Sequence, residues 1–432
     1  MEQTVTHKVA LRIIPLLVVC YLVSFIDKTN IGIAQLGMQG ALGLSDAAFG
    51  FGAGIFFVGY FLFEVPSNMA LARFGARLWI ARIMITWGII VIATAMVQGV
   101  VSFNIARFLL GAAEAGFYPG ALYYLSTWVP EKHRAKYIGL FLLANPVSTV
   151  VGAPAMGALL EMHGLWGIEG WQWVFIVTGL PAVLLAVLVI WKLPDRPERA
   201  AWLNADEKRW LLDTLAEERA KAPVRHSNPW KSLLDPKVLF LAVWFAAFPT
   251  AAYGLRLWLP TLIESFGVSA LVNGLLNAIP FAFGALALVI VPRLAVRSGH
   301  SYRWIAITTS TAAVGLVLTV VTGNLALELV FLCVAAIGMF GGQPVFWSLP
   351  SKLLVGANAA AGLALVNSVG NLGGFVGPYA VGAIRQATGS LSASMLFLAL
   401  VMVAAAVLAG VGSRVLKQRG TEHLDSTEHV KA

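Results

Sequence analysis

Long apolar stretches alternate with short polar ones along the whole chain, and they predict membrane-spanning helices. Each stretch has roughly 20–25 residues, which is enough for an α-helix to cross the hydrocarbon layer of a bilayer. The first stretch has no small-residue cleavage pattern, so we expect a retained helix and not a signal peptide. The pattern predicts twelve spans, at residues 9–35, 46–72, 77–99, 102–127, 136–161, 171–193, 238–263, 270–295, 302–323, 325–350, 358–385 and 391–414.

The longest polar interruption separates six spans from six. We expect an N-terminal six-helix bundle at 1–193, a cytoplasmic linker at 194–237, a C-terminal six-helix bundle at 238–416 and a polar cytoplasmic tail at 417–432. In the linker, Asn204 can cap a short helix whose apolar stripe includes Leu211 and Leu215. This helix is either a regulatory or docking element or an amphipathic linker lying under the bundle, and we favour the linker.

The two halves of the chain carry similar segments at corresponding positions. "ARFGARLWIA" lies between spans 2 and 3, "VRSGHSYRWIA" lies between spans 8 and 9, and their glycines, Gly75 and Gly299, are 224 residues apart. Two related six-span halves imply pseudo-symmetric bundles with a binding site near the membrane midplane between them. The expected fold is therefore an all-α membrane protein of twelve transmembrane helices, with both termini cytoplasmic and the architecture of a transporter.

Composition excludes a soluble domain and explains the positive charge. Only 12% of the residues are charged, 59% are hydrophobic and the mean hydropathy is +0.80, whereas soluble domains carry about 25% charged residues. The net charge of +9 follows the positive-inside rule, so it does not indicate nucleic-acid binding. All but four of the 30 Lys and Arg fall on the expected cytoplasmic side, the exceptions being Arg385 outside and Lys28, Arg107 and Arg256 within spans.

Charged residues inside spans are the main candidates for function. A charge near the centre of a membrane helix costs roughly 2.5–3.5 kcal/mol, so it must be paired or line a water-filled path. The expected depths permit an Asp27–Arg107 pair and leave Glu114 near a central cavity. Six ionisable residues are of this kind: Asp27, Lys28, Glu64, Arg107, Glu114 and Arg256.

Several motifs together resemble the major facilitator superfamily and, more narrowly, its anion:cation symporter family. That family includes bacterial permeases for tartrate, phthalate, hydroxyphenylacetate and sugar acids such as galactonate. Two positions depart from its usual pattern: Lys28 stands where Arg is usual, and Arg256 stands where a small residue is usual. The motifs are "FIDKTNIG", "FEVPSN", "RFLLGAAEAGFYPG", "GWQWVF", "LPDRPERAAWL", "YGLRLWLP" and "NSVGNLGGFVGP".

The resemblance implies roles for the buried charges. It implies that Asp27 and Glu114 are protonation sites, and that Lys28 and Arg107 serve substrate binding or gating. We expect Lys28 to attract a substrate carboxylate, Arg107 to hold either substrate or Asp27, and desolvated Glu114 to carry the coupled proton. The alternative is an interhelical ion-pair lock without proton movement.

Other polar residues have more than one interpretation. Tyr60 and Asn145 match substrate-lining positions of the family, and Asn367 could bind substrate hydroxyls, but such side chains also bond neighbouring helices. Arg256 could bind a second carboxylate, or it could extend to the outer interface. Near the cytoplasmic end of span 2, we expect Glu64 to form a structural gate contact with Arg73 and Arg77.

These observations predict a secondary transporter that imports a small organic anion by proton symport with alternating access. The anion would be a dicarboxylate, a sugar acid or an aromatic acid. Alternatives are an exchanger or uniporter of the same fold, or a transporter-like membrane sensor, which would need an extra signalling domain. The sequence lacks a phosphate-binding glycine loop, a His-Glu-x-x-His motif and a nucleophile elbow, so we expect no enzyme and no cofactor or metal. We expect a monomer in the bacterial inner membrane.

Overall fold

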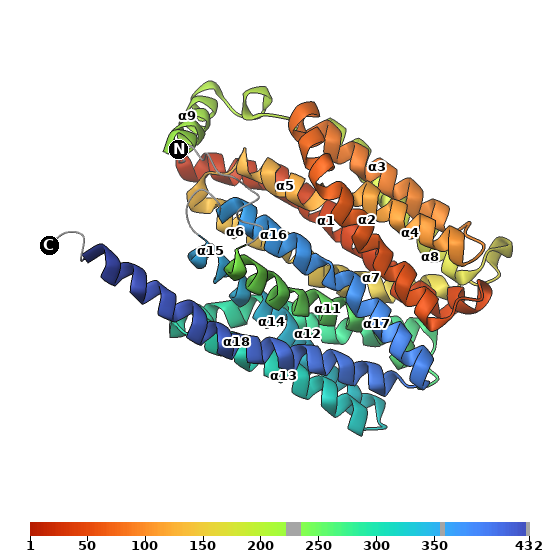
Figure 1. The fold of residues 1–432 in the computed structure, drawn as a ribbon. Helices are drawn as coiled ribbons and strands as arrows, with labels where there is room; N and C mark the ends of the chain where they lie inside the picture. Colours follow the sequence, from red (N-terminus) through yellow and green to blue (C-terminus); the bar gives the residue numbers. More distant parts are fainter. Residues whose placement is uncertain (222–234, 355–358, 429–432) are drawn as a thin grey trace. The chain divides into compact units, whose positions relative to one another are not determined.

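The computed structural model describes residues 1–221, 235–354 and 359–428, and every regular element in these ranges is a helix (Figure 1). The prediction of an all-α fold is confirmed. The chain forms two compact units: unit 1 is Met1–Val224 with Leu259–Ala278, and unit 2 is Arg225–Trp258 with Ile279–Ala432. The predicted bundle boundaries at 193 and 238 stay a prediction.

Unit 1 is built on the first long helix, which packs against two others. Helix α1 packs on α7 and α8, α3 packs on α8, and α2 packs on α4. The unit also includes the end of α11 and the start of α12. Its helices are α1 (Glu2–Ala41), α2 (Asp46–Phe74), α3 (Ala76–Thr94), α4 (Val100–Glu114), α5 (Phe117–Ser126), α6 (Glu131–Leu142), α7 (Ala144–Leu160), α8 (Gly170–Lys192) and α9 (Ala205–Lys221), with short 3₁₀ turns at Leu165–Gly167 and Pro197–Arg199.

Unit 2 holds the remaining helices. Helix α13 packs on α14 and α18, and α17 packs on α18. The helices are α11 (Pro236–Glu264), α12 (Ala270–Ser298), α13 (Ser301–Val321), α14 (Leu325–Trp347), α15 (Pro350–Leu353), α16 (Ala359–Asn371), α17 (Gly373–Thr388) and α18 (Leu391–Glu428).

Most predicted spans are helices, but three of them are broken. In the described part of the chain, 11 helical segments are long and apolar enough to cross a membrane. The predicted span at 358–385 is instead two shorter helices, α16 and α17, which meet at Leu372. The predicted spans at 102–127 and 136–161 are likewise divided, into α4 and α5 and into α6 and α7. Each break falls beside glycine, proline or asparagine, which weaken a continuous helix.

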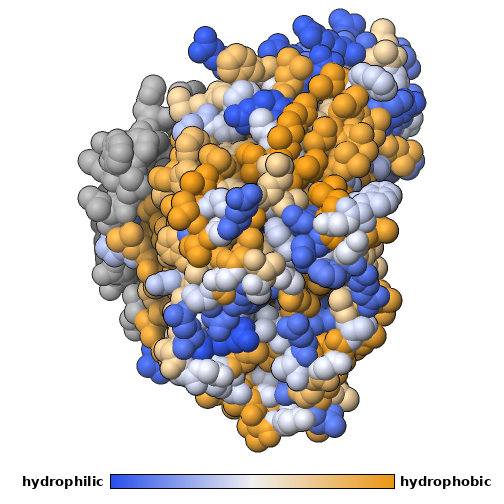
Figure 2. All heavy atoms as spheres, turned by 90° about the vertical axis from the view of Figure 1, so that its right-hand side faces the viewer, coloured by the Kyte–Doolittle hydropathy of each residue, from blue (hydrophilic) through white to orange (hydrophobic). Residues whose placement is uncertain are grey.

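Large apolar side chains lie exposed along these helices. Met69 is 71% exposed and Trp191 is 78% exposed. Hydrophobic residues also cover much of the face shown in Figure 2, between patches of hydrophilic ones. A soluble monomer rarely exposes such large apolar surface, so these side chains are suited to contact lipid.

Helices α7 and α12 touch backbone to backbone, which explains why Leu259–Ala278 belongs to unit 1. A Cβ atom added to Gly157 would lie 2.4 Å from the carbonyl oxygen of Ala270. A Cβ atom added to Gly274 would lie 2.3 Å from the carbonyl oxygen of Ala153. Only glycine at both positions allows this approach, as expected where membrane helices pack through small residues.

We predict that Gly274→Ala destabilises unit 1 by about 1–3 kcal/mol, because the new methyl group must push two backbones apart. The measurement is thermal unfolding of the detergent-purified protein. Gly139→Ala is the matched control, because Gly139 is helical and has nothing within 4 Å of its added Cβ. Equal unfolding temperatures for the two variants would contradict the close contact.

The predicted linker helix is present as α9, and its cap is confirmed. The Asn204 side chain accepts the Glu207 N–H at 2.8 Å, and Glu207 accepts the Asn204 N–H at 3.0 Å. Glu207 also forms an ion pair with Lys8 near the start of α1, at 2.6 Å. Leu211 and Leu215 are buried. Helix α9 is therefore fastened to the end of unit 1 at which α1 begins.

The Lys8–Glu207 contact predicts a pH dependence of stability. The hydrogen bond from Lys8, together with the Asn204 N–H, holds the pKa of Glu207 below its ordinary value of 4.5. A lowered folded-state pKa stabilises the fold above 4.5, and this contribution is lost as the pH falls through the folded-state pKa. We expect Glu207→Gln to unfold at a lower temperature than wild type at pH 7, and the difference to shrink below pH 4.5. A difference that is independent of pH would contradict this.

Candidate functional site

Asp27 and Lys28 are neighbours on α1, but they face different helices. Successive residues of an α-helix point about 100° apart. Asp27 is fully buried and faces α3, where its Oδ2 atom accepts the Trp87 indole N–H at 3.0 Å. Its Oδ1 atom has no hydrogen-bond partner in the described part of the chain. The Asp27 carboxylate thus accepts a hydrogen bond from a neutral donor and forms no ion pair in the described part of the chain.

Lys28 and Glu114 form a buried ion pair between α1 and α4. The Lys28 Nζ atom lies 3.0 Å from Glu114 Oε1, and both side chains are less than 10% exposed. The Ser24 hydroxyl donates to the same Oε1 atom. Glu114 Oε2 has no partner among the described residues. One oxygen of the carboxylate therefore carries both contacts, and the other stays open.

Aromatic rings surround the Lys28 ammonium. Its Nζ atom lies 5.0 Å from the ring centroid of Tyr60, 5.1 Å from that of Phe25 and 6.0 Å from that of Phe56. Ring faces attract a cation without neutralising it, and the attraction is strongest away from water. The structure thereby brings Tyr60, a residue predicted to line the site, next to the predicted substrate-binding amine.

Arg107 does not pair with Asp27, so the pairing expected from depth is wrong. Its guanidinium lies 5.1 Å from the Phe56 ring, and the side chain is 1% exposed. Within the described ranges, its Nε and Nη1 atoms have no hydrogen-bond partner. Depth along a helix does not say which side of the helix a residue occupies, and Asp27 faces α3 instead. Arg107 remains a buried cation with unused donors.

Helix α4 ends at Glu114, which the sequence analysis did not predict. The chain breaks at Gly116, whose φ of 87° lies in the left-handed region, and α5 begins at Phe117. A Cβ atom on Gly116 would lie 2.4 Å from the Ser67 hydroxyl oxygen, so no larger residue fits. The signal was present in "EAGFYPG", where glycine and proline follow the acid. Broken membrane helices commonly end at binding sites.

The charges at the ends of α2 and α3 are arranged differently from the prediction. Arg77 binds Asp195, which lies 3.5 Å from its Nε atom and accepts its backbone N–H at 3.2 Å. Asp195 therefore caps the first turn of α3. Arg73 lies over the Phe74 ring at 5.6 Å, and neither arginine forms an ion pair with Glu64 in the described part of the chain. The sequence did not predict the role of Asp195, although this residue lies in the motif "LPDRPERAAWL".

The other predicted residues are Asn145 in unit 1 and Asn367 and Arg256 in unit 2. Asn145 is half-buried on α7, where its carbonyl accepts the Ser148 hydroxyl at 2.5 Å. In unit 2, Asn367 is half-buried on α16. Arg256 is 4% exposed, which does not fit an arginine that extends to the outer interface. Its guanidinium lies between the rings of Phe281, Phe340 and Tyr253, at 4.9, 5.6 and 5.9 Å.

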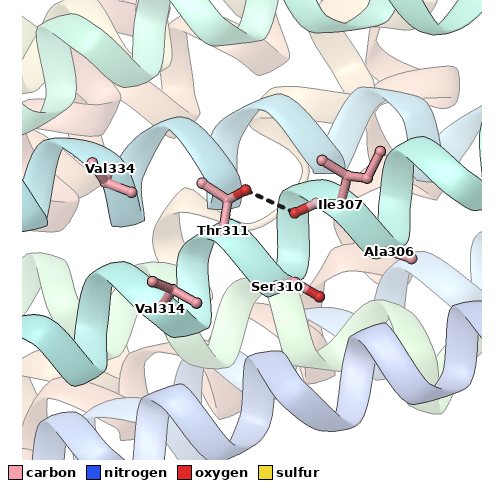
Figure 3. A pocket seen from close by; sticks show the side chains of 6 residues that line it. All are labelled: Ala306, Ile307, Ser310, Thr311, Val314 and Val334. Carbon is pink, nitrogen blue, oxygen red and sulfur yellow. Dashed lines mark hydrogen bonds between the residues drawn. The ribbon is translucent and has the colours of Figure 1, made fainter.

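One surface groove in unit 2 contains none of the residues predicted to be functional. It has a volume of about 480 Å³ and lies along α13 and α14, where the Thr311 hydroxyl is bonded to the Ile307 carbonyl at 2.8 Å (Figure 3). No ionisable side chain lines it. The described residues also contain no group of three metal-ligating side chains. The groove is lined by Ala306, Ile307, Ser310, Thr311, Val314 and Val334.

Comparison with known proteins identifies the class to which this fold and site belong. The sequence profile of the Major Facilitator Superfamily matches residues 17–378, and the chain belongs to this family of transporters. A solved structure of a bacterial homologue of the human lysosomal transporter Spinster, in an inward-facing and occupied conformation, has the same fold. Its TM-score is 0.78 at 19% identity, over 93% of this chain and 96% of that one.

Two relatives are similar over nearly their whole length. A quinolone resistance transporter of Acinetobacter baumannii is 43% identical over 98% of both chains. A protein of Agrobacterium vitis that is provisionally named a tartrate transporter is 45% identical over 97% of both chains. The resemblance to the anion:cation symporter type of permease is confirmed.

We predict that Trp87→Phe destabilises the protein by about 1–3 kcal/mol, because it removes the hydrogen bond to the buried Asp27 carboxylate while keeping an aromatic ring. Thermal unfolding of the purified protein measures the effect. Trp244→Phe is the matched control, because Trp244 is also fully buried but its indole N–H has no partner in the described part of the chain. If both variants lose equal stability, the hydrogen bond to Asp27 contributes nothing.

Proposed function

We propose that this protein imports a small organic anion together with a proton. The observation that supports the proposal is the buried Lys28–Glu114 ion pair, at 3.0 Å, beside the unpaired donors of Arg107. An ion pair in an apolar interior is stable only while both charges are matched. Any step that neutralises Glu114 therefore leaves Lys28 in need of another anion.

The proposed cycle exchanges the partner of Lys28. A proton binds Glu114, whose Oε2 atom has no partner among the described residues. The Lys28 ammonium then leaves Oε1 and binds a substrate carboxylate, while the Ser24 hydroxyl stays on Glu114. Arg107, with its free donors, offers the substrate a second cation. Release of the proton to the other side restores the ion pair and expels the substrate.

Charge balance supports coupling one proton to one carboxylate. The cluster holds two acids, Asp27 and Glu114, and two cations, Lys28 and Arg107, so its formal charge is zero. An anion entering alone would leave an uncompensated charge in a low-dielectric interior, which is costly. An anion and a proton entering together leave the formal charge at zero. Asp27 is the second candidate for a protonation site.

The chemistry around Lys28 favours a small carboxylate that carries apolar or aromatic surface. Lysine is a point charge on a flexible stem, whereas arginine holds a carboxylate through two fixed hydrogen bonds. A partner of Lys28 can therefore be exchanged readily. The rings of Phe25, Phe56 and Tyr60 offer contact surface beside the amine. Arg256, which is buried in unit 2, remains a candidate substrate ligand.

A second candidate function is exchange or export of an organic anion. The specific observation is the 43% identity to a protein named a quinolone resistance transporter, because transport out of the cell is one way in which a transporter can give resistance. Uptake into proteoliposomes with and without an inward pH gradient separates the two candidates. Substrate class is best sought with a thermal-shift screen of dicarboxylates, sugar acids and aromatic acids.

We predict that Glu114→Gln abolishes accumulation driven by a pH gradient but leaves substrate binding or exchange measurable, because the amide cannot carry the proton yet fills the same space. Accumulation is measured in proteoliposomes, and binding by thermal shift. Glu328→Gln is the control: Glu328 is also buried, but it lies in the first turn of α14, outside the cluster. Undiminished accumulation in Glu114→Gln would remove Glu114 from the mechanism.

A further inference from the structure

Two stacked aromatic rings with an arginine at each end form a ladder on the surface where α2 ends and α3 begins. The Arg73 guanidinium lies 5.6 Å from the Phe74 ring. Phe74 stacks on Trp79, with centroids 5.5 Å apart and planes 13° apart. The Arg82 guanidinium lies over Trp79 at 4.3 Å. The indole N–H of Trp79 donates to the Ser67 hydroxyl at 3.0 Å, which fixes the ring.

Both arginines of this ladder lack an acidic partner. Arg77, between them in sequence, binds Asp195. No carboxylate oxygen in the described ranges lies within 4 Å of Arg73 or Arg82, and both side chains are exposed. The rings attract the guanidinium groups but leave their positive charge in place. The ladder thus presents two uncompensated cations on a rigid aromatic support.

The surroundings of the ladder are those of a membrane-facing surface. Arg82 lies six residues after Ala76, the first residue of α3, or about 9 Å along the helix. Large apolar side chains are exposed on the same elements: Leu78 is 50% exposed, Phe74 56% and Met69 71%. A helical side chain points toward the N-terminus of its helix, so Arg82 reaches back over Trp79 toward the end that the basic residues predict to be cytoplasmic.

We propose that this ladder binds the phosphate of an anionic phospholipid of the cytoplasmic leaflet. The planar guanidinium group binds phosphate oxygens through two hydrogen bonds. The exposed Phe74 ring, the half-buried Trp79 ring and the exposed aliphatic side chains suit the glycerol and acyl region of the same lipid, because aromatic rings favour the membrane interface. A free phosphate would satisfy the arginines but not the apolar surface beside them, so the geometry favours the lipid.

The test is native mass spectrometry of the full-length protein purified in detergent and titrated with phosphatidylglycerol or phosphatidylcholine. We expect one phosphatidylglycerol site that Arg82→Gln weakens about fivefold, and that Arg73→Gln with Arg82→Gln weakens about 25-fold. These factors correspond to about 1 kcal/mol for each arginine near a membrane surface, at 1.4 kcal/mol per tenfold. Arg82→Lys should bind with intermediate affinity, because it keeps the charge but loses the planar group.

Two controls separate a loss of lipid binding from a loss of folding. Arg209→Gln removes an exposed arginine of α9, outside the candidate spans, and should leave lipid binding unchanged. Unfolding temperatures in mixed micelles of detergent and phosphatidylcholine show whether each variant folds. If the double variant does not fold, the comparison of Arg82→Lys with wild type tests the proposal. Equal phosphatidylglycerol binding by wild type, Arg82→Lys and the double variant would overturn the proposal. Displacement of the lipid by millimolar glycerol phosphate would assign the site to soluble phosphates instead.

Discussion

A buried ion pair between Lys28 and Glu114 joins α1 to α4 in unit 1, and it is stable only while both charges are matched. Lys28 and Glu114 satisfy each other across α1 and α4, and Ser24 supplies an extra donor to the carboxylate. Removing one member of such a pair leaves an uncompensated charge, which costs far more than the pair contributes. The pair therefore fastens two helices together only while both members keep their charges, which makes it a contact that a proton can break.

Aromatic rings are the second means by which this protein holds cations away from water. Phe56 serves both Lys28 and Arg107, while three other rings surround Arg256 in unit 2. A ring face stabilises a cation when no substrate is bound. It does not use the N–H donors in the plane of a guanidinium group. The Nε and Nη1 donors of Arg107, which have no hydrogen-bond partner among the described residues, therefore remain available to a carboxylate.

Much of the fold follows from sequence, because an apolar run of about 20 residues in a bilayer has little choice but to be helical. The cap of α9 was also readable, since Asn204 and Glu207 stand at the spacing of a reciprocal cap. The sequence did not show which of the buried charged residues contact each other. The depths of Asp27 and Arg107 overlap, but the direction of each side chain depends on how neighbouring helices are rotated. The sequence placed Arg82 among the cytoplasmic basic residues. Its exposed position on the side of α3 cannot be predicted from amino-acid composition.

The break between α4 and α5 has a mechanical consequence. Arg107 and Glu114 both lie on α4, and the chain then turns at Gly116 before α5 begins. A continuous helix would transmit any tilt of one end to the other as a rigid rod. Two rods joined at a glycine can change their mutual angle while the backbone of each stays intact. The break therefore separates the helix that carries both charges from the segment that follows it, so the direction of α5 is set at Gly116 and not by the axis of α4.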